Sequence, residues 1–540
     1  MPDASAIEQL WAGSPEQLKA AFYAAGATTA QRVGAVEAAL RSPVGPMLRK
    51  AAGKWIVERL PIEELVPEKY ASWRVLVQDA MQFTVWTLSA GRLAPKLVEQ
   101  WQLPTNTPTE KRLLLLIAKV PGLQKLGQVL ARNRHLLPPL RRALAELENS
   151  IRDVNPAEVR KIILRDLGPR LKENQVKLRP GIFSEASVSA VTRFTWWNPE
   201  LGRRERGVFK VLKPYIPVCF AEDMELLSRL AKYLGARHRE YGFGRRVLTD
   251  TFCDVRELLQ HEVNFAREQA TLQEAREMYR GVYGVRVPRV ISPLCTSRIT
   301  ALTEEPGKKI TNAARRLPMW RRLRLSEQLL EAFIAVPIFA AERRALFHAD
   351  PHAGNLLYDE KSGELVILDW ALTERVTREQ RRRLGLLFVM SALRDPAGMR
   401  QQIEALSRKR RKIGARQARI IRECVERFIA RLPLTRLPQA VDTTDLLEDI
   451  AFKGVRLPAP LIMLRKVLFT LDGVQHDLGA GDVGMVSIMA RQGLQNWLTS
   501  WSNVGSPLSW RDWLGVEWST LFLGGRLCRQ AMDAARSAIA

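Results

Sequence analysis

The sequence predicts an α+β fold, with helical regions at both ends of the chain and short β-runs in its middle. Apolar residues recur at helical spacing through residues 1–107 and 109–150, and return to it after residue 377. Between residues 183 and 303, short runs of β-branched and aromatic residues are joined by polar turns. The 540 residues suffice for several domains, and an apolar content of 46% excludes general disorder.

The helices of the first part are predicted to be separated by proline breaks. These breaks fall at Ser42-Pro43, at Leu60-Pro61 and between Pro104 and Pro108. Helical spacing continues over residues 109–150, and residues 156–175 form a further amphipathic helix. Within the first of these stretches lies L-Q-K-L-G-Q, residues 123–128. Composition alone indicates that Lys125 and Gln128 belong to a polar, solvated helix face.

The central β-runs place one lysine among apolar neighbours. Residues 183–195 and 206–213 are predicted strands, joined by the polar turn W-W-N-P-E-L-G-R-R. Lys210 lies inside the second strand, where an unpaired ammonium is costly to bury, so we expect an anionic partner. The alternative is an edge-strand lysine that faces water.

A candidate partner lies in residues 258–274, which are predicted to form one helix. Glu262, Phe265 and Glu268 fall there at positions i, i+3 and i+6. In kinases a strand lysine holds the α- and β-phosphates and is itself fixed by a helix glutamate, which makes Glu268 the candidate. The alternative is a solvated helix carboxylate. Strand character then returns over residues 287–303.

The stretch F-H-A-D-P-H-A-G-N, residues 347–355, carries the candidate catalytic residues, and predicted helices over 323–344 lead into it. Asp350 and Asn355 are five residues apart, as in a kinase catalytic loop. In such a loop the aspartate orients or accepts a proton from the attacking group, and the asparagine holds a metal ion. The spacing therefore predicts phosphoryl transfer.

A predicted β-hairpin connects this loop to a second carboxylate. Two apolar runs flank Lys361-Ser362-Gly363, so the hairpin should return Asp369 to the neighbourhood of Asn355. Their oxygen atoms would suit Mg²⁺, which bridges ATP phosphates. A transition-metal cluster of His348, Asp350 and His352 is the alternative, and it leaves Asn355 and Asp369 unexplained.

These motifs predict a two-lobed protein-kinase-like fold with a helical N-terminal extension and a helical C-terminal tail. Glu304–Gly307 is the candidate hinge, and helices resume at residues 377–391. The expected parts are an N-terminal helical region (1–107), a helical extension (108–175), an N-lobe (176–303), a C-lobe (304–480) and a tryptophan-rich helical tail (481–540).

Composition indicates a reducing compartment and an anionic partner. The five cysteines are scattered without a C-x-x-C pair, so neither disulfides nor a zinc ribbon are expected. The first residues show no secretory signal, and no apolar run near them is long enough to span a membrane. A net charge of +26 implies phosphates, nucleic acid or an acidic lipid surface.

Two C-terminal features favour the lipid surface among these partners. Residues 408–436 form a basic amphipathic helix beginning R-K-R-R-K, for which an ordinary solvated helix face is the alternative. The tail contains Trp497, Trp501, Trp510, Trp513 and Trp518, and tryptophan is favoured at membrane–water boundaries. A tryptophan-rich helix packed on the domain is the alternative there. Nucleic acid is not expected, because Phe428 is the only aromatic residue available for stacking in the basic helix.

Together these segments resemble the UbiB/AarF family of atypical protein-kinase-like proteins, from about Lys111 to Arg400. The resemblance assigns Lys125, Gly127 and Gln128 to the family's K-x-G-Q segment. It assigns Glu262 and Asn264 to the E-x-D segment and Ala186 and Ser187 to the nucleotide loop. Lys210 and Glu268 match its ATP-binding pair, Asp350 its catalytic residue, and Asn355 and Asp369 its metal ligands. Lys125 and Gln128 count with the catalytic residues, and Gly127, Glu262 and Asn264 with the regulatory ones.

The chain departs from this family's pattern at three motifs. Asn264 replaces the aspartate of E-x-D, and Ser184–Ala190 replaces the usual A-A-A-S followed by I-G-Q. The metal motif is Asp369-Trp370-Ala371 instead of D-F-G. Many members also end in membrane-spanning helices, which are not evident here. These departures concern nucleotide preference and affinity, because the residues matched to phosphates and metal are all present.

The resemblance implies an atypical kinase or ATPase that uses ATP and Mg²⁺. It also implies that the K-x-G-Q helices lie over the cleft in which a protein substrate would bind. It therefore favours ATP hydrolysis, or phosphorylation of an unidentified small molecule or lipid, linked to ubiquinone or isoprenoid-lipid metabolism. The expected location is cytoplasmic and peripheral on the inner membrane. One alternative is a non-catalytic nucleotide-binding scaffold. Another is a small-molecule phosphotransferase of the aminoglycoside- or choline-kinase type, in which residues 123–128 would have no role.

Overall fold

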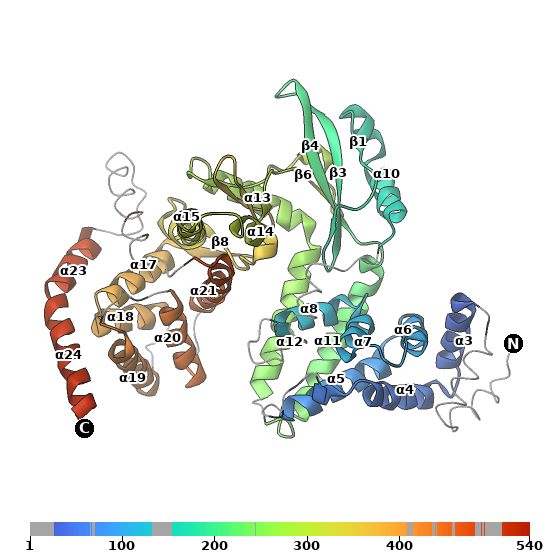
Figure 1. Cartoon of the computed structure of the whole chain (residues 1–540), viewed down its shortest axis with the longest axis horizontal. Coiled ribbons are helices and arrows are strands. Elements are labelled where there is room, and N and C mark those ends of the chain that lie inside the picture. Colours follow the sequence, from blue (N-terminus) through green and yellow to red (C-terminus); the bar gives the residue numbers. More distant parts are fainter. Residues whose placement is uncertain are drawn as a thin grey trace. The chain divides into compact units, whose positions relative to one another are not determined.

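The computed structural model divides the chain into two compact units (Figure 1). The first contains Met1–Phe265 and Ser292–Ala301, and the second contains Ala266–Ile291 and Leu302–Ala540. The structure describes residues 26, 28–64, 66, 68, 71–131, 154–242, 245–407, 414–434, 438, 440–455, 459–480, 488, 491 and 510–539. The R-K-R-R-K run, Trp497 and Trp501 lie outside these residues.

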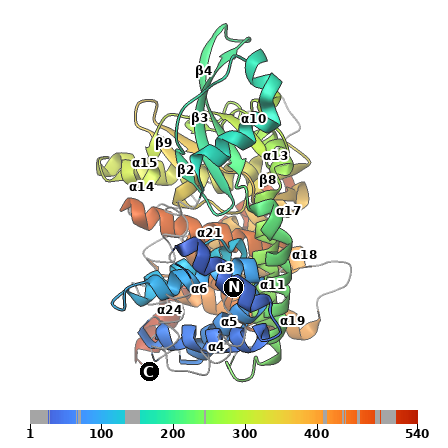
Figure 2. The ribbon, with the colours of Figure 1, turned by 90° about the vertical axis from the view of Figure 1, so that its right-hand side faces the viewer.

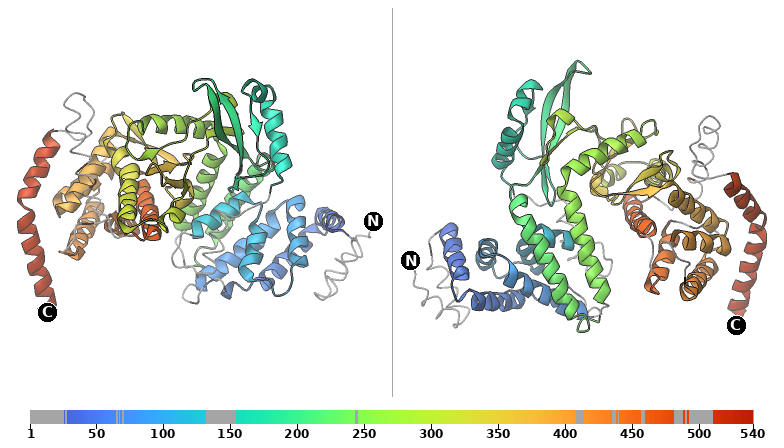
Figure 3. Two further views of the ribbon diagram at one scale, coloured as in Figure 1. Left: turned by 45° about the horizontal axis from the view of Figure 1, so that its top comes forward. Right: turned by 180° about the vertical axis from the view of Figure 1, so that it is seen from behind.

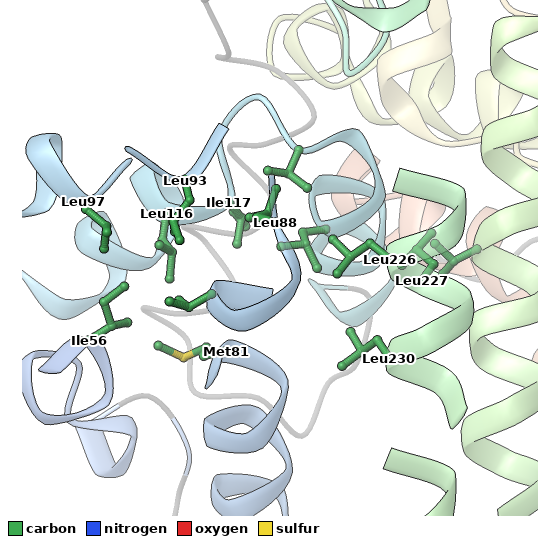
Figure 4. Close-up of a cluster of buried hydrophobic side chains, with 14 of the residues drawn as sticks. Ile56, Met81, Leu88, Leu93, Leu97, Leu116, Ile117, Leu226, Leu227 and Leu230 are labelled. Atoms are coloured by element: carbon green, nitrogen blue, oxygen red, sulfur yellow. The ribbon is translucent and has the colours of Figure 1, made fainter. Parts of the chain in front are cut away.

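The first unit begins with helices that end at the predicted proline breaks. They are α3 (Thr29–Arg41), α4 (Gly45–Arg59), η1 (Ile62–Glu64), α5 (Ala71–Thr87), α6 (Ala90–Gln102), α7 (Thr109–Ile117) and α8 (Pro121–Ala131). Figure 4 shows part of their core, in which apolar side chains of α4 to α7 meet Leu226, Leu227 and Leu230 of α11 (Ile216–Ala236). Burial of this apolar surface stabilises the helices, because isolated helices of this length are marginal in water.

The β-sheet of the first unit contains the predicted strand pair. Strands β1 (Lys177–Leu178), β3 (Ser189–Asn198), β4 (Arg203–Leu212) and β6 (Ile299–Thr303) are neighbours in that order, and β2 (Ser184–Glu185) also pairs with β3. Trp196 and Trp197, predicted to lie in the turn, belong to β3, since it pairs with β4 out to Asn198. Helix α10 (Pro156–Glu173) lies beside this sheet, as Figure 2 also shows.

Two long helices, α11 and α12 (Arg245–Val263), run side by side in the first unit (Figure 3). The predicted single helix over residues 258–274 is wrong, because it breaks at Asn264 between α12 and α13 (Phe265–Met278). Phe265 is fully buried just after the break. Glu262 and Glu268 therefore lie on different helices instead of one helical face.

The second unit contains the predicted catalytic hairpin. Its four-stranded sheet has the order β5 (Val285–Arg286), β10 (Glu364–Ile367), β9 (Leu356–Asp359) and β7 (Lys308–Lys309). Strands β8 (Arg344–His348) and β11 (Thr373–Thr377) form a separate pair. The helices predicted over 323–344 are α15 (Met319–Leu330), the π-helix η4 (Glu331–Ala335) and α16 (Val336–Phe339). The helical segment ends at Phe339, earlier than predicted, because Arg344 already belongs to β8 and pairs with Thr377.

Helices complete the second unit. They are α14 (Ile310–Ala314), α17 (Arg378–Ala392), α18 (Pro396–Ser407), α19 (Ala415–Arg431), α20 (Ala440–Phe452), α21 (Ala459–Leu478), α23 (Trp510–Leu521) and α24 (Leu523–Ile539). The apolar stripe of α19 is buried at Ile421, Cys424 and Val425, and the helix packs on α18 and α20. Within the described part of the chain, no helix combines the length and apolarity needed to cross a bilayer.

Candidate phosphoryl-transfer site

Main-chain hydrogen bonds build the catalytic loop of the second unit. The β9–β10 register pairs Leu356 with Ile367. Beyond it, the Leu368 N–H donates to the Asn355 carbonyl at 2.9 Å. On the other side of the loop, the Ala349 N–H donates to the Leu372 carbonyl at 2.9 Å. The predicted hairpin is therefore confirmed, and it brings the main chain next to Asp369 against Asn355.

His348 connects the two acidic segments. Its Nε2 lies 2.5 Å from the Asp369 carbonyl oxygen, and its Nδ1 accepts the Asp350 N–H at 3.2 Å. The ring is buried edge-on between Phe333 and Trp370, with centroid distances of 5.3 and 5.0 Å. The hydrogen-bond pattern requires the neutral tautomer protonated on Nε2. His348 thus holds the catalytic loop and the metal motif in one frame.

The same contacts argue against the alternative transition-metal cluster. Burial lowers the pKa of His348, which favours the neutral ring. Both ring nitrogens are already engaged, one as a donor and one as an acceptor, so His348 has no lone pair left for a metal ion. In His352, the other histidine of that alternative cluster, Nδ1 is also engaged, because it accepts the Gly354 N–H at 3.1 Å.

Asp350 and Asp369 are placed differently in this frame. Asp350 is 6% exposed, and its Oδ2 lies 4.0 Å from His352 Nε2. Asp369 is half-buried, and its Oδ1 accepts the Ala371 N–H at 2.9 Å. Asn355 is also half-buried. The segment thus offers carboxylate and amide oxygens, the donor types that Mg²⁺ prefers.

Lys210 is not an edge-strand lysine, because β4 lies between β3 and β6 in the sheet. It is half-buried opposite Val191, with its ammonium 5.6 Å from the centroid of the Phe265 ring. Glu268 is 2% exposed in the first turn of α13, so the solvated-carboxylate alternative is wrong. Lys210 belongs to the first unit and Glu268 to the second, and their pairing stays a prediction.

The first unit contains a cluster that the sequence did not reveal. The Lys125 ammonium of α8 forms an ion pair with Glu262 Oε1 of α12, and the Ser187 hydroxyl donates to Glu262 Oε2 at 3.0 Å. The side chains of Lys125 and Glu262 are 7% and 15% exposed. The polar-face interpretation of Lys125 is therefore wrong. The K-x-G-Q segment, the E-x-D segment and the nucleotide loop meet at one carboxylate.

The nucleotide loop is held at a second point. Lys213 Nζ lies 3.3 Å from Glu185 Oε2, and both side chains are buried. The Lys213 N–H donates to the Val188 carbonyl at 2.9 Å, and the Ala186 N–H to the Ser189 carbonyl at 2.8 Å. The sequence signal for this contact is Glu185, a charged residue in a loop of otherwise small residues.

For the remaining predicted site residues, the structure gives the position in the fold. Gly127 is buried in α8, and Gln128 belongs to the same helix, but its side chain lies outside the described part. Ala186 is exposed in the loop, and Asn264 is exposed at the break between α12 and α13. The roles assigned to all of these site residues stay predictions.

Comparison with known proteins gives a family for the central part of the chain. Residues 146–403 match the ABC1 atypical kinase-like domain. The chain is 24% identical over 371 residues to the protein ACTIVITY OF BC1 COMPLEX KINASE 7, chloroplastic, of Arabidopsis thaliana, covering 66% of this chain and 50% of that protein. It is 26% identical over 296 residues to the Probable protein kinase UbiB of Erwinia tasmaniensis, covering 54% and 52%. The matched part thus spans about half the length of these relatives.

A solved structure, the complex of Rv3197 with erythromycin from Mycobacterium tuberculosis, shares 17% identity with a TM-score of 0.45 and covers 68% of this chain and 89% of that one. The family match confirms the predicted resemblance and the kinase-like fold with helical regions on either side. Residues 146–403, just under half of the chain, are thus similar to the ABC1 atypical kinase-like domain.

Proposed function

We propose that the chain binds Mg²⁺–ATP and either hydrolyses it or transfers its terminal phosphoryl group to a small molecule or lipid. Asp350 would orient or deprotonate the attacking group, a role exerted in the transition state. Lys210 and Glu268 are assigned to the nucleotide by the order of the family motifs. A link to ubiquinone or isoprenoid-lipid metabolism is part of this proposal and rests on the family resemblance.

The contacts of His348 carry the proposal. A phosphoryl-transfer site needs a base and metal ligands fixed relative to one another, because catalysis there is mostly positioning and charge stabilisation. His348 bonds to the main chain of both Asp350 and Asp369, and Asn355 bonds to Leu368 next to Asp369. These hydrogen bonds join the main chain of three residues that have oxygen-bearing side chains, which supports the proposal.

Asn355 and Asp369 would hold the Mg²⁺. Their amide and carboxylate oxygens fit this hard cation, and the engaged nitrogens of His348 do not compete for it. When bound, the cation would neutralise charge on the ATP phosphates. The chain's own contribution is the fixed carboxylate of Asp350, which is buried and therefore acts in a site with little competing water.

The test separates binding from turnover. Asp369→Asn should reduce the thermal shift induced by Mg²⁺–ATP, whereas Asp350→Asn should keep that shift and lower phosphate release by about 10²-fold or more. Glu374→Gln, an exposed carboxylate of β11, is the matched control and should change neither. An unchanged shift in Asp369→Asn would refute the metal assignment. A parallel loss of shift and turnover in Asp350→Asn would make that residue structural.

A non-catalytic nucleotide-binding scaffold is the second candidate function. It is favoured by the two side-chain contacts that hold the nucleotide loop, Ser187 to Glu262 and Lys213 to Glu185. A loop held in one conformation can bind nucleotide without making the conformational change that phosphoryl transfer would require. The scaffold would be supported if ATP induces a thermal shift but the parent chain releases no more phosphate than Asp350→Asn. Phosphate release is measured with quinone precursors, lipids and amino-alcohols as candidate substrates. The amino-alcohol arm also tests the aminoglycoside- or choline-kinase alternative.

The C-terminal helices support an anionic membrane surface as a partner. Leu514, Trp518, Leu521 and Phe522 of this region are 51%, 66%, 75% and 49% exposed. The Trp518 and Phe522 rings contact each other edge-on at 5.5 Å. Arg529 follows on α24 as an exposed positive charge, whereas the Arg526 guanidinium lies 3.5 Å from Asp395 Oδ2. Aromatic and leucine side chains beside arginines are suited to a membrane interface.

Vesicle co-sedimentation tests this surface. Trp518→Ala should weaken binding to anionic vesicles several-fold, and salt should weaken binding of the parent chain by screening. Trp320→Ala is the matched control, because Trp320 of α15 is 64% exposed against 66% for Trp518. Equal binding to neutral and anionic vesicles, or equal effects of both variants, would refute the membrane proposal.

A further inference from the structure

The first unit contains a large cavity that none of the motifs above uses. It has a volume of about 910 Å³ and is lined by α3, α6, the turn after α7, the start of α10 and the segment that follows β4. Most of this lining precedes residue 146, where the kinase-like match begins. Ligand sites for organic molecules range over roughly 300–1,000 Å³, so the cavity is large enough for one.

Lys96 places a buried cation in the cavity lining. The residue is 7% exposed on α6, and its ammonium donates to the main-chain carbonyls of Leu115 and Ala118. Arg92, one turn earlier on the same helix, differs in its partners. Its guanidinium lies 2.7 Å from Asp223 Oδ1 and 3.2 Å from Glu222 Oε2. Arg92 is therefore matched by carboxylates, whereas Lys96 is held by carbonyl dipoles.

Lys119 adds a second cation and a strained main chain. It is an exposed residue of the lining with φ of 54°, a left-handed conformation that non-glycine residues rarely adopt. Its carbonyl accepts the Arg92 guanidinium at 3.1 Å, which fixes this conformation. Such strain persists where the surrounding structure requires it, and it is frequent at binding sites. Here it sets a lysine at the cavity.

The rest of the lining is largely apolar. Val33 of α3, Pro95 and Leu103 on and after α6, and Pro214 and Tyr215 after β4 provide carbon surface. Pro95 lies inside α6 and is exposed, although a proline at that position removes a helical hydrogen bond. The charged residues of the lining are Arg92, Lys96 and Lys119 against Glu99 and Glu158, so positive charge is in excess. Together with the apolar walls, this matches a ligand that has both an anionic and an apolar part.

We propose that this cavity binds an amphipathic anion, a single-chain molecule whose anionic head pairs with Lys96 and Lys119 and whose apolar body lies along Val33, Leu103 and Tyr215. The head group would add a directly bound countercharge to the Coulombic attraction of Glu99, because the main-chain carbonyl partners of Lys96 carry no net charge. A carboxylate and a phosphate monoester share this chemistry. The site is separate from the proposed phosphoryl-transfer residues, so it does not depend on the proposed function.

The proposal has a consequence for proton binding. Burial lowers the pKa of Lys96 to about 7. Glu99, Arg92, Lys119 and Asp223 also act on this ammonium from α6, the turn after α7 and α11, while Glu158 and Cys219 line the same cavity. A bound anion would raise the pKa of Lys96, so binding should take up a proton above pH 7. The affinity should then fall by up to about tenfold per pH unit between pH 7 and 9.

Isothermal titration of the full chain with decyl phosphate and decanoate, below their micelle concentrations, tests the site. Both should bind, and decanol, which lacks the charge, should bind at least tenfold more weakly. Lys96→Met removes the ammonium but keeps the chain length, and should weaken binding of both anions by tenfold or more. Lys111→Met, an exposed lysine of α7, is the matched control and should leave binding unchanged.

Folding and the source of the ligand are controlled in the same series. Lys96→Met should unfold in urea at the same or a higher midpoint, because it removes a buried charge. Ala118→Phe should block the cavity and abolish binding of anions and decanol alike. The proposal is overturned if Lys96→Met binds decyl phosphate as the parent does, if decanol binds as tightly as the anions, or if decyl phosphate binds only when presented in vesicles. Proton uptake on binding makes the measured binding enthalpy depend on the ionisation enthalpy of the buffer. A binding enthalpy at pH 8 that is the same in different buffers would therefore also overturn the role of Lys96.

Discussion

The catalytic loop of the second unit and the nucleotide loop of the first unit are held in place by different kinds of contact. Main-chain bonds fix the catalytic loop, with Ala349 and Leu368 as donors, and one buried neutral ring, His348, joins its ends. The nucleotide loop also has main-chain bonds, but side-chain charges are added to them through Glu262 and the Glu185–Lys213 pair. The first kind of contact follows from strand pairing, whereas the second depends on which residues stand at distant positions.

This difference determines how each loop responds to change. A main-chain frame survives most substitutions, since any residue supplies the same N–H and carbonyl groups. A buried charge cluster is sensitive to each member, because removing one leaves another uncompensated in a medium of low dielectric. Substitutions in the catalytic loop other than at His348 should therefore change the free energy of unfolding little. In the nucleotide loop, substitution of any member of the charge cluster should lower it.

The largest expected effect is that of Glu262→Gln. This change leaves the Lys125 ammonium, 7% exposed, without its carboxylate and should lower the free energy of unfolding by about 3–5 kcal/mol. Urea unfolding followed by circular dichroism measures it. Glu257→Gln on the same helix is the matched control, because Glu257 is 65% exposed and should change stability by less than about 0.5 kcal/mol.

The double variant Lys125→Met/Glu262→Gln sharpens this prediction. Removing both charges should recover much of the loss, so the two substitutions should be strongly non-additive. If Glu262→Gln costs no more than Glu257→Gln, or if the double variant is simply additive, the cluster is not a coupled ion pair. The nucleotide loop would then resemble the catalytic loop in its tolerance, and the contrast between them would disappear.

A smaller but distinctive effect is expected for His348→Ala. The change removes the partner of the buried Asp350 N–H and Asp369 carbonyl and should cost about 2–4 kcal/mol at pH 7.5. His476→Ala, an exposed histidine of α21, should cost less than about 0.5 kcal/mol. A loss equal to that of the control would show that strand pairing alone holds the catalytic loop.

The pH dependence of His348 provides a second readout. Burial lowers its pKa in the folded chain below the ordinary value of 6.5. The unfolded chain therefore binds the proton first, and the stability contributed by His348 is complete above pH 6.5 and falls as the pH drops through 6.5 toward the folded-state pKa. Between pH 7.5 and 5.5 the parent should lose more stability than His348→Ala. Parallel loss in both would mean that other groups cause the acid sensitivity.

Local sequence was sufficient for the catalytic loop. Two apolar runs around the turn at residues 361–363 predicted a hairpin, and β9 and β10 form it, with Leu356 paired to Ile367. Strand pairing depends on local apolar runs and a turn, so it can be inferred from neighbours in the chain. The helix breaks at Ser42 and Leu60 were predictable for the same reason, because proline acts on adjacent residues.

The long-range ion pairs were not predictable in this way. Lys125 and Glu262 are 137 positions apart, and Ser187 and Glu262 are 75 apart. A lysine on a helix has the same local pattern whether it faces water or a buried carboxylate, so composition alone indicates a solvated Lys125, and only the family resemblance assigns it a role in the site. The break at Asn264 was missed as well, because helical spacing of Glu262, Phe265 and Glu268 continues across it. Tertiary burial of Phe265 decides that geometry.

The smallest expected effect concerns a single hydroxyl of the nucleotide loop. Ser187→Ala removes the bond to Glu262 Oε2 at 3.0 Å but leaves the Lys125–Glu262 ion pair in place. The loss in unfolding free energy should therefore be about 1–2 kcal/mol, less than for Glu262→Gln.

The effect of Ser187→Ala on the loop itself should be larger than its effect on global stability, since the hydroxyl joins the loop to α12 while the Glu185–Lys213 pair still holds the other side of the loop. Hydrogen exchange at the Ala186 amide, which donates to the Ser189 carbonyl, should accelerate about tenfold. Ser184→Ala, exposed in the same loop, is the matched control and should leave that amide unchanged. If both variants exchange alike, main-chain bonds hold the nucleotide loop as they hold the catalytic loop, and Glu262 serves only to neutralise Lys125.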